Sequence, residues 1–207
     1  MRVALFGGTF DPPHRGHLAI AKAAADAFRL NHVLFAPVGR QPLKDKHGVS
    51  PFQDRVAMVE LACASDARFE VSRIDWPRDD GQPNYTVDAL TLLEIAYPRN
   101  RRFNLVGADS FLHVRQWREP DRMLELADWI VVSRPGFSLA GLDEMGWTPE
   151  QRARIHLLEG VQEDVTATAL RERLEAGACC TDVLPEAVAD YIERHGLYRG
   201  RRQARSK

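Results

Sequence analysis

A loop near the N-terminus combines two glycines with two histidines that are three residues apart. It runs from Gly7 to His17 with the sequence GGTFDPPHRGH, between a short apolar run and an alanine-rich segment. Glycines let a ligand approach the main chain closely, and a following helix directs its unpaired N–H groups and positive dipole end to the same place. His14 and His17 would project from one face of that helix, where ring N–H groups can donate to phosphate oxygens. The loop therefore predicts a phosphate site.

Other interpretations of this loop are weaker. It contains neither the GxGxxG of dinucleotide binding nor the GK[ST] of a P-loop. The two histidines could also be surface residues or half of a metal site. The remaining five of the seven histidines stand in no matching motif, however, and the loop holds no cysteine. We therefore predict no protein-bound metal.

A second candidate anion site lies near residue 170. Thr166 and Thr168 place hydroxyl groups at the expected start of a helix, and Arg171 follows three residues later. Taken alone, Thr166 is an ordinary helix cap and Arg171 a solvated charge. Together with the N–H groups of a helix start, the hydroxyls and the guanidinium would form another cradle for phosphate.

Apolar runs that alternate with helical patterns predict the scaffold for both sites. We expect strands at residues 3–6, 33–36, 69–74, 103–106, 129–132 and 155–158, and helices at 18–28, 52–64, 86–97, 167–176 and 185–195. This alternation predicts an α/β fold, a Rossmann-like doubly wound parallel sheet with helices on both faces, followed by a C-terminal helical segment. In such sheets ligands bind outside the carboxyl ends of the strands. The loops expected to line the site begin at Gly7, Pro37, Gly107 and Ser133.

The composition is that of an ordinary globular chain. The 207 residues carry a net charge of −1 with 44% hydrophobic residues, which excludes fibrous and disordered classes. We expect one domain over residues 1–197 and a basic, disordered tail over residues 198–207, whose five bases are typical of a solvated terminus. The charge balance predicts no nucleic-acid partner, and the absence of an apolar run of about 18 residues predicts no membrane partner. The three cysteines suit a reducing compartment, so we expect a cytoplasmic location.

The first loop resembles the GxFxPxHxGH signature of the nucleotidyltransferase superfamily, whose members transfer a nucleoside monophosphate from a nucleoside triphosphate. GTFDPPHRGH, from Gly8 to His17, matches it throughout. The resemblance implies that His14 and His17 hold the triphosphate and stabilise the charge that develops as pyrophosphate leaves. It implies further ATP contacts from Gly7, Gly8, Thr9 and Phe10.

The segment around Arg171 resembles the ISSTxxR motif of the same superfamily. The resemblance implies that Thr166 and Thr168 bind the triphosphate and that Arg171 acts together with the two histidines in catalysis. The chain departs from the motif at Ala167, where the family has a second serine.

Other segments resemble one branch of the superfamily, the nicotinate-nucleotide adenylyltransferases. GADSF at 107–111 followed by Trp117 is similar to GxDxF…W, VVSRPG at 131–136 to vvxRPG, NYT at 84–86 to SYT, and QPLK at 41–44 to PPHK. In the last of these Leu43 replaces a histidine. The resemblance covers nearly the whole chain.

Membership of this branch implies an enzyme that joins ATP and nicotinate mononucleotide into deamido-NAD and pyrophosphate, with Mg²⁺ accompanying ATP. It implies adenosine or triphosphate contacts from Gly107, Asp109 and Arg134, and mononucleotide contacts from Lys44, Tyr85, Thr86 and Trp117. From its residue type alone, Trp117 is as compatible with a core position as with stacking on a pyridine ring, and Asp109 with an ordinary helix cap.

Three rival functions remain open at this point. One is another adenylyltransferase of the superfamily, such as one acting on phosphopantetheine, and another is a non-catalytic nucleotide sensor on the same fold. The third is an RNA-binding module that uses the basic tail. The choice between acid and amide mononucleotide is open, and so is the oligomeric state, with a homo-oligomer among the options.

Overall fold

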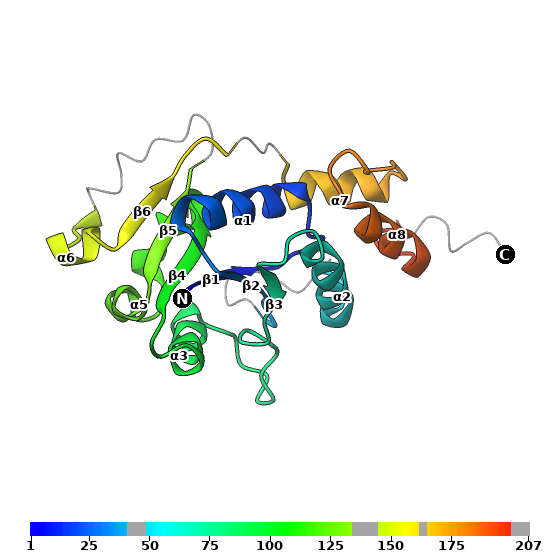
Figure 1. Ribbon diagram of the computed structural model, residues 1–207. Helices are drawn as coiled ribbons and strands as arrows, with labels where there is room; N and C mark the ends of the chain where they lie inside the picture. The colour runs from blue at the N-terminus through cyan, green and yellow to red at the C-terminus, as the bar shows by residue number, and fades with distance from the viewer. Residues whose placement is uncertain (41–48, 134–144, 162–164, 200–207) are drawn as a thin grey trace.

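A parallel β-sheet runs through the middle of the protein (Figure 1). The computed structural model describes residues 1–40, 49–133, 145–161 and 165–199, and within them six strands follow the order β3-β2-β1-β4-β5-β6. Each neighbouring pair is parallel. The strands are β1 (Arg2–Gly8), β2 (His32–Pro37), β3 (Phe69–Val71), β4 (Arg101–Gly107), β5 (Asp128–Val132) and β6 (Ile155–Leu158). The expected Rossmann-like α/β architecture is confirmed.

Helices cover both faces of the sheet. They are α1 (Arg15–Phe28), α2 (Phe52–Cys63), α3 (Thr86–Ala96), α4 (Ala108–Phe111), α5 (Pro120–Leu126), α6 (Pro149–Arg152), α7 (Ala167–Glu175) and α8 (Glu186–His195). α1 and α2 lie on one face of the sheet, and α3 and α5 lie on the other (Figure 1). Buried side chains of each helix pair join a separate apolar cluster with the strands. In the part of the chain that the structure describes, no helix has the length and apolarity needed to cross a membrane.

Burial on both faces explains why the central strands are apolar without interruption. Successive side chains of a strand point to opposite faces of its sheet. In β1, Val3 and Leu5 join the apolar cluster with α3 and α5, whereas Ala4 and Phe6 join the cluster with α1 and α2. A two-sided core leaves no solvent-facing position in the strand, so no polar residue interrupts the run.

A third apolar cluster joins the C-terminal helices to α2. Met58 and Ala62 of α2 share it with Leu170 of α7 and with Val188 and Ile192 of α8, and all five are buried. Met58 is fully buried in this cluster. Because α2 also packs against β2 and β3, it fixes the C-terminal helical segment relative to the sheet.

The winding of the chain reverses between β1 and β4 in the middle of the sheet. β1 pairs with β2 on one side and with β4 on the other, where Phe6 lies opposite Leu105. The carboxyl ends of parallel strands meet at one edge of a sheet, so the loops after Gly8 and Gly107 open beside each other. Ligands of this class of fold bind in the crevice at such a switch point.

Among the predicted elements that the structure describes, two have an end that lies three residues from the predicted one, and the others agree within two residues. The strand expected at 69–74 ends at Val71, because the Ser72 hydroxyl accepts the N–H of Ile74 at 3.3 Å and turns the chain out of the ladder. The first helix starts at Arg15 instead of residue 18, which places His14 at its N-cap.

Tyr198 belongs to the packed body of the protein, so the tail was predicted to start too early. Its ring packs against the third apolar cluster and its hydroxyl donates to Asp11. The preceding residue, Leu197, is tied to α8 by a hydrogen bond from its N–H to the carbonyl of Ile192 at 3.0 Å. The remaining tail residues, 200–207, lie outside the described residues.

Candidate active site

The two histidines of the first loop form a contacting pair at the start of α1. The backbone N–H of His14, the N-cap residue, donates to Nδ1 of His17 at 3.2 Å. Because Nδ1 of His17 accepts this bond, a neutral His17 ring carries its proton on Nε2. The ring centroids of the pair are 3.8 Å apart, and the Phe10 ring packs edge-on to His17 at 5.0 Å. The pair is therefore oriented by the fold, and the structure brings together the two residues that the sequence predicts to hold phosphate.

The glycines of the loop permit its tight path. A Cβ at Gly8 would lie 3.0 Å from Cζ of Phe10, whose own backbone is left-handed with φ of +49°. Gly7 is exposed, and a Cβ there would meet nothing within 4 Å, so its main chain faces open space. Thr9 adds a buried hydroxyl oxygen that has no hydrogen-bond partner among the described residues. Such an orphaned polar atom is a natural contact for a ligand.

The start of α7 lies against this loop. Arg171 donates through Nη1 to the carbonyl oxygen of Asp11 at 2.9 Å and through Nη2 to Oγ1 of Thr168 at 3.3 Å. Thr166 caps the helix by accepting the N–H of Ala169 at 3.2 Å, as the sequence predicts. The two candidate anion sites of the sequence are therefore one site, which contains two helix N-termini.

The end of β4 supplies a carboxylate beside the switch point. Gly107 is the N-cap of α4, so the cap alternative for Asp109 is wrong; Asp109 is exposed in the first turn. A Cβ at Gly107 would lie 2.6 Å from Oδ1 of Asp109. Any larger residue at position 107 would require the Asp109 carboxylate to move.

The start of α3 is tied to the loop that follows β2. Asn84 donates its N–H to the carbonyl of Arg40 at 2.9 Å and accepts the N–H of Arg40 on Oδ1 at 3.2 Å. Its Nδ2 donates to the carbonyl of Trp76 at 2.8 Å. Tyr85 and Thr86 follow directly, as the N-cap and first residue of α3. The asparagine that stands in place of the family's serine thus joins two of the loops implied in mononucleotide binding.

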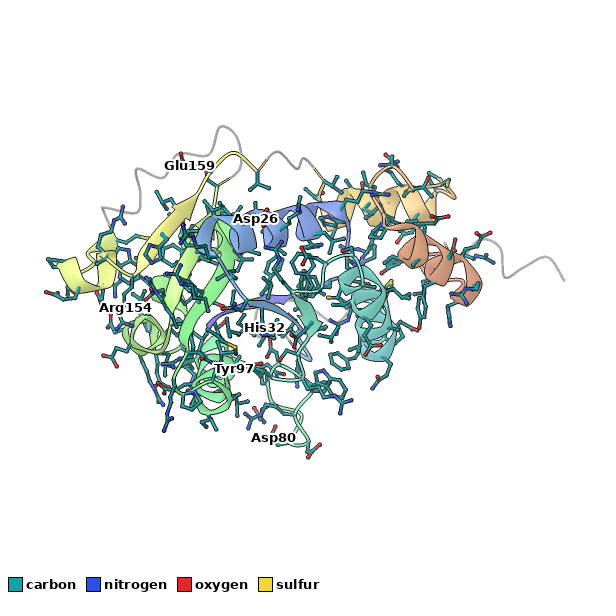
Figure 2. The ribbon with its side chains drawn as sticks, viewed as in Figure 1. Asp26, His32, Asp80, Tyr97, Arg154 and Glu159 are labelled. Atoms are coloured by element: carbon teal, nitrogen blue, oxygen red, sulfur yellow. The ribbon has the colours of Figure 1, made fainter. Side chains whose placement is uncertain are left out.

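The same junction holds a titratable group and a close backbone approach. Burial raises the pKa of Asp75 to about 7, assisted by the charge of Asp88 and opposed by a hydrogen bond from Asn84. The N–H of Gly39 donates to the carbonyl of Asp75 at 2.7 Å. A Cβ at Gly39 would lie 2.4 Å from the backbone nitrogen of Pro77, so this position requires glycine. From here the loop between β3 and α3 projects away from the body, with Asp80 near its tip (Figure 2).

Trp117 packs at the margin of the core. Its ring is partly buried against the cluster with α3 and α5, and its centroid lies 6.1 Å from that of Trp129. Tyr85 packs against the same cluster, and the guanidinium of Arg118 lies 4.9 Å from its ring centroid. The core position considered for Trp117 is thus realised in part. Arg118 adds a positive charge here that the sequence analysis does not identify.

Two of the predicted site residues, Lys44 and Arg134, lie outside the described residues. The other predicted residues fall into two groups. In the first group, a direct hydrogen bond joins the loop after β1 to α7. In the second group, Asp109 lies in the short helix that follows β4, Thr86 begins α3, and Trp117 ends the 3-10 turn that comes after α4.

Arg55 of α2 holds the loop after β1 in place, a role that none of the sequence motifs implies. Its guanidinium is buried and donates to the carbonyls of Thr9 at 2.8 Å and Val38 at 3.0 Å, and its Nε donates to that of Ser50 at 3.3 Å. Burial lowers its pKa, and the nearby charge of Asp11 opposes that shift. The available signal is the position of this arginine at helical spacing from Val59 and Ala62, on the apolar side of α2, because a buried guanidinium needs partners.

A parallel sheet with a glycine and histidine loop at its switch point defines a nucleotide-binding protein of the nucleotidyltransferase class, and residues 5–173 match the family model described as Cytidylyltransferase-like. Over 199 residues the chain is 44% identical to a protein of Roseiflexus sp. (strain RS-1) named "Probable nicotinate-nucleotide adenylyltransferase", covering 95% of this chain and 98% of that one. A protein of Saccharopolyspora erythraea with the same name is 37% identical over 199 residues, covering 96% and 90%. The chain belongs to the nicotinate-nucleotide adenylyltransferase family.

Solved structures agree on the fold. The nicotinic acid mononucleotide adenylyltransferase of Plasmodium falciparum complexed with NaAD superposes with a TM-score of 0.76 at 15% identity, covering 95% of this chain and 97% of that one. The same enzyme complexed with APC gives a TM-score of 0.74 at 14% identity, with 95% and 96% covered. At these identities the likeness concerns the arrangement of strands and helices.

Proposed function

We propose that this protein transfers AMP from ATP to nicotinate mononucleotide, forming deamido-NAD and pyrophosphate. The observation that carries the proposal is the junction of the two signature segments, in which Arg171 donates to the carbonyl of Asp11 beside the His14 and His17 pair. The names of the relatives support the reaction, and the ligands of the Plasmodium falciparum structures support nucleotide substrates.

The triphosphate would lie over the start of α1. The donors available to it there would be the Nε2–H of His17, the main chain of Gly7 and Gly8, and the hydroxyl of Thr9. Arg171 adds a fixed positive charge from α7, with Thr166 and Thr168 beside it. Donors held in place before reaction stabilise the negative charge that grows on pyrophosphate as it leaves.

The transfer needs no covalent intermediate with the protein. A phosphate oxygen of the mononucleotide attacks the α-phosphorus of ATP, a new P–O bond forms, and the bond to the bridging oxygen of pyrophosphate breaks. The protein contributes positioning and charge stabilisation. The histidines and the arginine of the site suit these two tasks, and no cysteine lies beside them in the described segments.

The two remaining parts of the substrates would lie on either side of this centre. Asp109, at the end of β4, would accept hydrogen bonds from the ribose hydroxyls of ATP beside Gly107, with Arg134 near the phosphates. On the other side, Trp117 and Tyr85 would flank the pyridine ring, Thr86 would donate to its carboxylate, and Lys44 would hold the attacking phosphate.

Magnesium would enter with ATP. Among the described residues there is no group of three or more His, Cys, Asp or Glu side chains arranged as metal ligands. The phosphate oxygens of ATP would therefore supply most of the ligands for the ion, which would offset phosphate charge during the transfer.

The free state of Cys63, Cys179 and Cys180 supports a reducing cytoplasmic setting.

The test is to mix the purified protein with ATP and Mg²⁺ and follow pyrophosphate with each candidate acceptor in turn. Nicotinate mononucleotide should give release, and phosphopantetheine should give none. Release with phosphopantetheine alone would move the protein to another branch, and tight ATP binding without release with any acceptor would identify a nucleotide sensor. RNA binding that is lost when residues 199–207 are deleted would support the third rival.

A further inference from the structure

We propose that Tyr198 is a positioning residue for the triphosphate loop, which it holds through the carboxylate of Asp11. The proposal rests on the proposed adenylyl transfer and adds to it a role for the residue that follows the last helix.

The carboxylate of Asp11 is engaged at both oxygens. The hydroxyl of Tyr198 donates to Oδ1 at 2.5 Å, and the N–H of Ser50 donates to Oδ2 at 3.1 Å. Asp11 itself is only 1% exposed. A buried carboxylate that loses one of its donors is left with unsatisfied lone pairs or must move toward water.

Asp11 controls the loop because its main chain belongs to the site. Its carbonyl accepts from Arg171 at 2.9 Å, so the side chain and the main chain of one residue meet Tyr198 and Arg171 respectively. The preceding residue, Phe10, is held in a left-handed conformation with φ of +49°. A shift of Asp11 would therefore change the direction of the loop between Thr9 and His14 and would move the oxygen that orients Arg171.

Two residues in the left-handed conformation bring the Tyr198 hydroxyl to Asp11. Gly196 ends α8 with φ of +62°, and Tyr198 has φ of +61°, a conformation that bulky residues rarely adopt. The ring packs against the cluster shared by α2, α7 and α8. A strained backbone conformation persists only where surrounding contacts hold it in place. For Tyr198 one of these contacts is the hydrogen bond to Asp11, in the loop before α1.

Tyr198 can act only as a donor in this position. Burial raises the pKa of its hydroxyl, and the charge of Asp11 raises it further. The phenol therefore stays protonated at neutral pH and does not serve as a base. Its contribution is to hold geometry.

The chain offers a matched control in Tyr191. Its hydroxyl also donates to a carboxylate, Oδ1 of Asp54, at 2.8 Å, and it also joins the C-terminal segment to α2. Asp54 has no contact with the loop among the interactions that the structure describes. Tyr198→Phe and Tyr191→Phe therefore remove the same chemical group, but only the first removes it from the triphosphate loop.

The experiment measures kcat and KM for ATP and for nicotinate mononucleotide in both variants, together with Tm and with ATP affinity by calorimetry. Tyr198→Phe should lower kcat/KM for ATP by about tenfold and weaken ATP binding, with KM for the mononucleotide within about twofold of wild type. Tyr191→Phe should change each of these constants by less than about twofold. Equal constants in the two variants, or a loss in Tyr198→Phe that only scales the amount of active enzyme, would overturn the proposal.

A double-mutant cycle keeps the test decisive if Tyr198→Phe is unstable. In an Asp11→Ala background, Tyr198→Phe should cost far less than in wild type, because the acceptor of the Tyr198 hydroxyl has already been removed. Additive losses would overturn the proposal. A wild-type protein that binds ATP without releasing pyrophosphate would refute only the proposed function, since the ATP affinities of the variants would still decide the role of Tyr198.

Discussion

The guanidinium of Arg171 donates to the main-chain carbonyl of Asp11 across 160 residues of sequence. Its second nitrogen contacts the hydroxyl of Thr168 on its own helix. One side chain therefore holds the start of α7 against the loop that precedes α1. The start of α1 and the start of α7 therefore lie at one place, where the positive ends of two helix dipoles favour a negatively charged ligand.

Replacing His17 tests the donor role of the histidine pair. His17→Ala should lower kcat by about 10²–10³, because a donor aimed at developing charge acts mainly in the transition state. His32→Ala is the control. His32 begins β2 at the opposite edge of the sheet, where it pairs with Glu70 (Figure 2). Steady-state turnover of both variants is the measurement, and near-normal kcat in His17→Ala would remove the ring from the mechanism.

Replacing Arg171 tests the junction itself. Arg171→Ala should lower kcat/KM for ATP by about ten- to hundredfold, because a charge-assisted contact and the anchor on Asp11 are lost together. Arg173→Ala serves as the control, since that arginine lies on the same helix, is exposed and pairs with Asp182 at 2.9 Å. Similar kinetics in the two variants would show that Arg171 is a surface charge.

Adding one methyl group at Gly107 tests the place of Asp109. The Cβ of Gly107→Ala would lie 2.6 Å from Oδ1 of Asp109, so the carboxylate must move. KM for ATP should rise by about tenfold, as expected for a lost hydrogen bond to a charged group. Asp109→Asn should show a comparable rise, and the double variant should show little more. An unchanged KM in Gly107→Ala would exclude this carboxylate from ATP binding.

The raised pKa of Asp75 predicts a pH dependence of stability. The pKa of this residue is about 7 in the folded protein, against an ordinary value of 3.8 for an aspartate side chain. Between these values the folded state holds a proton that the unfolded chain has released, so the free energy of unfolding falls as pH rises through this range. Asp75→Asn lacks this penalty and should gain on the order of 3 kcal/mol in the free energy of unfolding relative to wild type between pH 5 and pH 8. Urea denaturation at the two pH values measures the change, and a pH-independent difference would contradict it.

The parts of the fold and site that could be predicted from sequence are those with local signatures. β1 was recognisable because burial on both faces makes Val3 to Phe6 apolar throughout. The cap at Thr166 was recognisable because hydroxyls at helix starts accept a nearby N–H. The early stop of β3 is not predictable in this way, because it depends on a hydrogen bond that the Ser72 hydroxyl accepts from the N–H of Ile74, which no hydrophobic period reveals.

The parts that could not be predicted depend on contacts between distant segments. The basic residues that follow Tyr198 predict a solvated tail there, and nothing in its neighbours reveals a partner 187 residues away. Arg55 was left without a role for the same reason, although its three carbonyl partners lie in the loops after β1 and β2 and before α2. Long-range polar contacts need the folded chain to identify them.

The reaction assigned to this site joins ATP to nicotinate mononucleotide. The most direct measurement is chromatographic detection of deamido-NAD alongside pyrophosphate when the purified protein is given ATP, Mg²⁺ and nicotinate mononucleotide, with nicotinamide mononucleotide in a parallel reaction. We predict deamido-NAD and pyrophosphate in equal amounts, with a higher kcat/KM for the acid than for the amide. Absence of a dinucleotide product with either pyridine mononucleotide would contradict the account.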